Sequence, residues 1–129
     1  MEVSTLNLLV GWVSMLCGLI VGAIIGLFFH REEWMGGYSS FRRRMTRLGH
    51  ISFFGLGFIN VIFALSAKTL ALPETQAQLA STGFALGAIT MPLCCFLTAW
   101  RKSFRHLFPI PVLSVLAGIL FLLLGWAAG

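Results

Sequence analysis

Long apolar runs alternate with short polar segments along the chain. The apolar runs cover residues 7–29, 51–67, 79–100 and 110–128. Each is close to the roughly 20 residues that a helix needs to cross about 30 Å of hydrocarbon. Because lipid offers no hydrogen-bond partners, a spanning segment must satisfy its own backbone, which favours an α-helix in every run. The pattern therefore predicts an all-α integral membrane four-helix bundle, with residues 1–129 forming a single transmembrane domain.

The composition agrees with a lipid environment and excludes several classes of protein. The chain is 58% hydrophobic and 10% charged, with no aspartate, whereas a soluble domain is about 25% charged. A soluble enzyme and a disordered tail are both excluded. The net charge is +5, but the basic residues flank apolar runs, so we expect no nucleic-acid partner. Because Cys17, Cys94 and Cys95 all lie inside apolar runs, we expect buried free thiols.

The distribution of basic residues predicts the orientation in the membrane. The segments 30–50 and 101–109 hold eight of the nine lysines and arginines, whereas 68–78 holds only Lys68. By the positive-inside rule, the two basic segments are cytoplasmic loops, and both termini lie on the outer, periplasmic or extracellular, side. We therefore expect a multi-pass protein of a bacterial inner or plasma membrane. The loop arginines would bind anionic lipid headgroups.

The first basic loop contains a local helical signal. Phe41, Met45 and Leu48 recur at helical spacing with arginines between them, and Ser40 is a suitable N-cap. We expect one or two amphipathic turns over 41–48 that lie at the interface and lead into the second spanning helix, which His50 opens.

Small residues recur on one side of several predicted helices. In lipid, such residues let helix backbones approach closely and associate through van der Waals packing. Asn60 lies on the same stripe as Gly57, where a polar side chain typically faces protein rather than lipid. The predicted packing residues are Gly18, Gly22 and Gly26 in the first helix, Gly57 and Asn60 in the second, and Gly83 and Gly87 in the third.

All three histidines fall on the predicted cytoplasmic side. One hypothesis is a b-type haem with His50 as one axial ligand and either His106 or His30 as the other, because haem iron binds neutral imidazole. Nearby arginines suit the haem propionates or a quinone headgroup, and those available are Arg43, Arg47 and Arg105.

Two alternatives remain for the histidines. They could be interfacial side chains that bond to headgroups and backbone. They could also hold zinc, copper or iron, with His50 and His106 as the principal ligands and His30, Glu33 or Cys94 as further ones. The order of a basic loop, a histidine and a Gly/Asn helix is similar in type to small membrane cytochromes and respiratory-complex subunits, with no diagnostic motif behind it.

No catalytic motif is present, and no carboxylate lies within an apolar run, which argues against a proton-coupled carrier. We therefore expect a small membrane subunit of an electron-transfer or respiratory-type complex that holds one haem b near the cytoplasmic face. The alternative is a non-catalytic scaffold or assembly subunit that packs against larger membrane partners through its glycine faces. A small oligomeric transporter or channel is a third, weaker option.

Overall fold

The computed structural model describes all residues from Met1 to Gly129 and contains no strand. Four long helices follow one another, α1 (Val3–Phe28), α2 (Phe41–Thr69), α3 (Glu74–Trp100) and α4 (Pro109–Ala128). Two short 3-10 helices, η1 (Trp34–Gly36) and η2 (Lys102–Leu107), lie in the two longer connections. The prediction of an all-helical fold is confirmed, and all four helices are long and apolar enough to cross a membrane.

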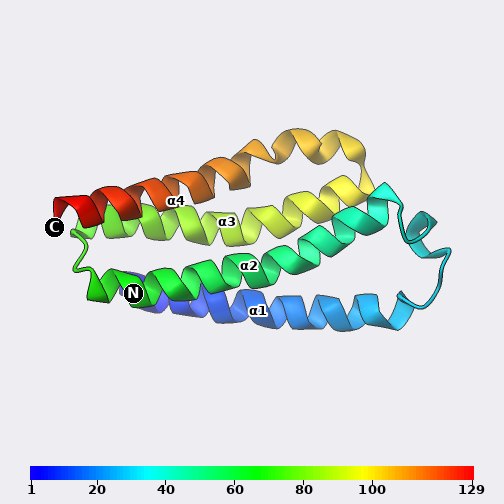
Figure 1. Cartoon of the computed structure of the whole chain (residues 1–129), viewed down its shortest axis with the longest axis horizontal. Helices are drawn as coiled ribbons and strands as arrows, with labels where there is room; N and C mark the ends of the chain where they lie inside the picture. The colour runs from blue at the N-terminus through cyan, green and yellow to red at the C-terminus, as the bar shows by residue number, and fades with distance from the viewer.

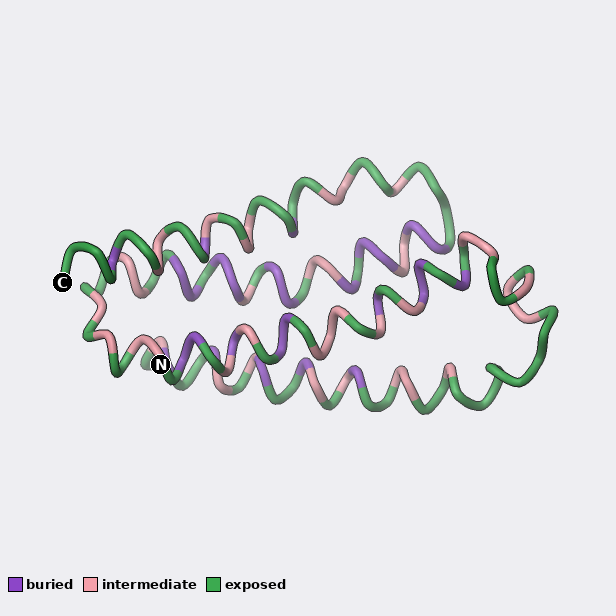
Figure 2. Tube along the Cα trace, in the orientation of Figure 1, coloured by how far each residue is buried: buried purple, intermediate pink, exposed green.

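The helices form an open arrangement rather than a closed ring. Each helix packs against the next in the chain, and α1 also touches α3, whereas α1 and α4 lie at opposite edges (Figure 1). Both termini lie at one end of the molecule, and η1 and η2 lie at the other. Buried residues gather on α2 and α3, while most of α4 is exposed (Figure 2). The packed interior is therefore the set of faces that α2 and α3 share with their neighbours.

The second helix begins ten residues earlier than the predicted span. It starts at Phe41 and runs for 29 residues, or about 43 Å at a rise of 1.5 Å per residue. The Ser40 hydroxyl accepts a hydrogen bond from the Arg43 backbone N–H at 3.2 Å, which confirms Ser40 as the N-cap. The amphipathic turns are therefore continuous with the spanning helix. His50 lies about 13 Å along the axis from Phe41 rather than at the helix mouth.

The other helix ends follow simple local chemistry. Only Leu70–Pro73 connect α2 to α3, so these two helices are antiparallel neighbours. Pro109 occupies the first position of α4, where a missing backbone N–H costs little. The first helix begins at Val3, earlier than the predicted residue 7, and this places Asn7 well inside it.

Candidate functional site

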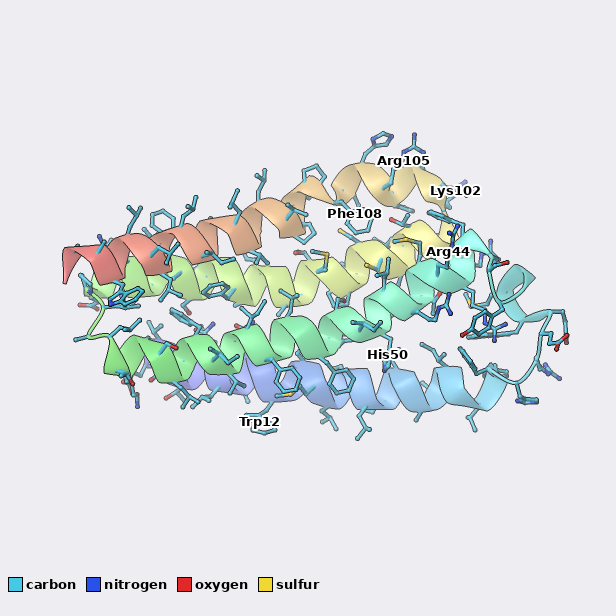
Figure 3. All side chains as sticks on the ribbon, viewed as in Figure 1. Trp12, Arg44, His50, Lys102, Arg105 and Phe108 are labelled. Carbon is cyan, nitrogen blue, oxygen red and sulfur yellow. The ribbon has the colours of Figure 1, made fainter.

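The imidazole of His50 fills the contact between α1 and α2. A Cβ atom placed on Gly22 would lie 2.5 Å from the His50 Nε2 atom. The edge of the ring meets Phe54, with ring centroids 5.6 Å apart and planes at 82°. Figure 3 shows His50 directed toward α1. His50 therefore packs against a glycine of the neighbouring helix, and a helix backbone lies beside its Nε2 atom.

The other two histidines lie elsewhere. His30 is exposed just beyond the end of α1, eight residues past the level of Gly22, or about 12 Å along the helix axis. His106 is exposed on η2, which packs against α3 and α4. No three His, Cys, Asp or Glu side chains are grouped closely enough to hold a metal ion. The structure does not bring the predicted axial or metal ligands together.

Arg43 is buried in a cage of backbone carbonyls and aromatic rings at the end of α1. Its side chain is 1% exposed. The Nη2 atom donates to the Phe29 carbonyl at 2.6 Å, and Nη1 donates to the carbonyls of Arg31 at 3.2 Å and Glu32 at 3.4 Å. Phe29 is the C-cap residue of α1, and Arg31 and Glu32 belong to the segment that follows the helix. Arg43 thus contacts the end of α1, and its role toward propionates or a quinone stays a prediction.

Aromatic rings complete this cage. The Arg43 guanidinium lies 4.7 Å from the ring centroid of Phe29, 5.1 Å from Tyr38 and 5.4 Å from Trp34. Such contacts stabilise a cation that is removed from water. Arg47 covers the Tyr38 ring at 4.7 Å. The sequence showed a run of arginines but not which of them turns inward, because that depends on how the loop folds back.

Replacing Arg43 tests the cage. We expect Arg43→Gln to lower the free energy of unfolding by about 2 kcal/mol, because hydrogen bonds to a charged group contribute about 1.5–3 kcal/mol. Arg44→Gln, at an exposed neighbour, should change it by less than about 0.5 kcal/mol. Unfolding in mixed detergent micelles, followed by circular dichroism, measures both. Equal effects of the two substitutions would show that the cage does not stabilise the protein.

A second polar cluster joins α1, α2 and α3 at the level of Asn7. Asn7 Nδ2 donates to Asn60 Oδ1 at 2.7 Å, and the Ser81 hydroxyl donates to Asn7 Oδ1. Asn60 Nδ2 donates to the carbonyls of Leu56 at 2.8 Å and Phe84 at 3.0 Å. Asn7 and Asn60 are fully buried, and Ser81 is 2% exposed. All three side chains are neutral and hydrogen-bonded, so the cluster stabilises the packing of α1, α2 and α3. None of the three side chains is a titratable group.

The sequence indicated Asn60 but missed Asn7 and Ser81. Asn7 is the first residue of the first apolar run, and a polar residue at that position is easily taken to mark the start of the helix. Its position in a run with few other polar residues was the available signal, since a lone amide in a spanning helix typically faces protein. Ser81 carried no comparable signal, because serines commonly bond to their own helix.

Several glycines lie where two helix backbones approach each other. A Cβ on Gly18 would meet the Phe54 ring at 2.7 Å, and one on Gly57 would meet the Gly11 carbonyl at 3.0 Å. On α3, a Cβ on Gly83 would lie 2.5 Å from the Ser114 carbonyl, and Gly87 faces Val115. Gly26, placed on the same predicted stripe, has no atom within 4 Å of its Cβ position. The glycines therefore close contacts within the chain, and Gly26 is left outside them.

The cysteines also serve packing. Cys95 forms a small buried cluster with Met45 and Ala99, and the Cys94 thiol lies 3.7 Å from the Leu107 carbonyl. All three cysteines are free, and Cys94 and Cys95 are buried as predicted, whereas Cys17 is only half-buried.

Arg105 remains exposed on η2, on the opposite side of α3 from His50 (Figure 3).

Comparison of this chain with protein-family models, curated proteins and solved structures finds no match.

Proposed function

We propose that the protein is a non-catalytic structural subunit that holds neighbouring proteins in a larger membrane assembly. The observation that carries this proposal is the open arrangement of the helices. Only 17% of the apolar stretch in α1 is buried within the chain. For the apolar stretch that includes α4 the buried share is 11%. The two edge helices therefore offer long apolar faces to other helices.

The character of the interior supports a structural role. The polar groups of the three-helix cluster are bonded to one another, and the Ser14 hydroxyl donates to the Phe53 carbonyl at 2.7 Å. The helix contacts are closed by glycines. A proton-coupled carrier typically uses a carboxylate within its spanning helices, whereas Glu2 and Glu74 lie at helix ends.

The predicted packing glycines make contacts within this chain, with the exception of Gly26. Gly18, Gly22, Gly83 and Gly87 are covered by this chain's own helices. Partners would instead meet the outer faces of α1 and α4, where the exposed side chains are Leu, Ile, Val and Trp. The electron-transfer complex remains a prediction. If the protein is such a subunit, His50 is the candidate haem ligand, because it is the single histidine inside one of the four long helices.

Photo-crosslinking in the native membrane tests the proposal. A photoreactive residue at Trp12 of α1 or at Leu120 of α4, both exposed edge positions, should give a protein adduct of one defined mass. The same residue at Ile62 of α2, which is 61% exposed, serves as the control and should give lipid adducts. A series of edge positions that yields only lipid adducts would contradict a subunit role.

The proposed orientation places the basic end in the cytoplasm, and cysteine labelling tests it. Thr75 and Ser103 are exposed at opposite ends of the molecule. A membrane-impermeant maleimide added to intact cells should modify Thr75→Cys, and it should modify Ser103→Cys only after permeabilisation. The native cysteines lie within helices and should stay unlabelled. The reverse pattern would place the termini in the cytoplasm.

A further inference from the structure

An apolar groove runs between α1 and α3 on one face of the molecule. Its volume is about 520 Å³, and nearly all of its surface is hydrocarbon or aromatic carbon. Phe53 of α2 also contributes to it. The groove is lined among others by Val13, Cys17, Phe53, Ala88, Pro92 and Phe96. Its shape and chemistry suit a hydrocarbon chain, because no charged side chain and only one hydroxyl, that of Ser14, belongs to its lining.

A smaller pocket adjoins this groove toward the basic end. Its volume is about 270 Å³, and its lining includes Arg42, Thr46 and Trp100 together with Phe96. Phe96 belongs to the lining of both spaces. From Trp100 to Ala88 the path along α3 is 12 residues, or about 18 Å at 1.5 Å per residue. Together the two linings present a basic end and an apolar stretch about as long as a fatty acyl chain.

Arg42 is held in place at this basic end. Its Nε atom donates to the Ala99 carbonyl at 3.1 Å, and the residue is exposed. No carboxylate pairs with it, since the one ion pair of the protein joins Lys68 to Glu2 at the opposite end. The guanidinium thus keeps its terminal N–H groups for a ligand. A planar guanidinium is well suited to bind a phosphate oxygen pair.

The side chains around Arg42 fit a lipid headgroup region. Trp100 is 66% exposed, and Arg101 lies over its ring at 5.8 Å. Lys102 lies 4.9 Å from the Phe41 ring centroid. Tryptophan and basic residues typically occupy the level of the headgroups. Figure 3 shows Lys102 and Arg44 at this same end of the molecule.

We propose that these two spaces form a binding site for one anionic phospholipid. The phosphate binds Arg42 beside Trp100, and one acyl chain passes Phe96 and lies in the groove between α1 and α3. The site rests on the proposed membrane placement, in which the basic end lies among lipid headgroups. It goes beyond a general attraction of arginines to lipid, because it assigns the headgroup contact to one arginine and gives the chain a defined path.

Native mass spectrometry of the detergent-purified protein tests the site with phosphatidylglycerol and, as a neutral comparison, phosphatidylcholine of the same chains. One phosphatidylglycerol should stay bound preferentially. Arg42→Gln should weaken this binding about fivefold, the effect expected of one basic residue near a lipid headgroup. Arg44→Gln removes the same charge from an exposed residue of the same turn and should change binding less than twofold.

A second pair of variants tests the path of the acyl chain. Cys17→Phe fills the groove and should weaken binding of both lipids, whereas Leu16→Phe, at an exposed neighbour outside the lining, should not. If Cys17→Phe is unfolded by circular dichroism, Val13→Phe provides the same test from another wall position.

Three outcomes would overturn the site. Equal losses for Arg42→Gln and Arg44→Gln would indicate diffuse attraction to the basic end. Unchanged binding in both groove variants would place the chain elsewhere. A photoreactive residue at Val13 that captures a protein would mean that a partner helix occupies the groove. The subunit proposal is tested separately at Trp12 and Leu120, which do not line the groove.

Discussion

Gly83→Leu should lower the free energy of unfolding by about 3 kcal/mol, at the upper end of the cost of overpacking a closed contact. A Cβ at this position would lie 2.5 Å from the Ser114 carbonyl and 2.8 Å from the Gly118 backbone nitrogen. Both neighbours are backbone atoms of α4, which no change of side-chain rotamer can move. The leucine must therefore push α4 away from α3. Unfolding by a denaturing detergent, followed by circular dichroism, measures the loss.

Two other glycines provide matched controls for this prediction. Gly55 in α2 and Gly26 in α1 have no atom within 4 Å of a Cβ. Leucine at either position adds a side chain that faces lipid and replaces a glycine in a helix interior, where glycine is disfavoured by about 1 kcal/mol relative to alanine. Both variants should be as stable as the parent or slightly more so. A Gly83→Leu variant as stable as Gly55→Leu would show that α3 and α4 do not pack as described.

Asn60→Leu should lower the free energy of unfolding by about 2 kcal/mol. The substitution removes the acceptor at 2.7 Å from Asn7 Nδ2, and Asn7 is fully buried. Leaving a buried donor without its partner costs about 1–3 kcal/mol. The remaining contact of that donor, to the Ser81 carbonyl, is long at 3.4 Å. Unfolding of Asn60→Leu by a denaturing detergent, followed by circular dichroism, measures this loss.

A double-mutant cycle separates the cluster from the size of the side chain. Asn7→Leu and Asn60→Leu combined should cost less than the sum of the two single changes, because the second substitution removes a group that the first left unsatisfied. Thr82→Val on α3 is the control, since its exposed hydroxyl bonds only to the Gln78 carbonyl of its own helix. Strictly additive losses would show that the two asparagines do not interact.

The four long apolar helices were predictable because their signal is local. An apolar run of about 20 residues has few alternatives to a membrane helix. Serine is a preferred N-cap residue, so Ser40 indicated the start of α2. The early start at Phe41 was less visible, since the arginines of 41–48 resemble a loop. They are good helix formers, and one of them, Arg43, gains its partners only when the segment after α1 folds against α2.

The candidate site was less predictable because its contacts join distant parts of the chain. The bonds of Asn7 reach residues 53 and 74 positions away. Spacing along one helix could place Gly26 on a stripe with Gly22, but it could not show that no neighbouring side chain or backbone reaches Gly26. Likewise, three histidines on one side of the membrane did not imply one site. His50 lies between α1 and α2, whereas His106 lies on η2.

The proposed structural role predicts that the interior of this protein holds no haem. An absorption spectrum of the purified protein, oxidised and then reduced with dithionite, tests this most directly when the cells are supplied with haem and the protein is shown to be helical. We expect no Soret band in the wild-type protein or in His50→Ala. A Soret band that sharpens on reduction and disappears in His50→Ala would overturn the structural role and favour the electron-transfer subunit.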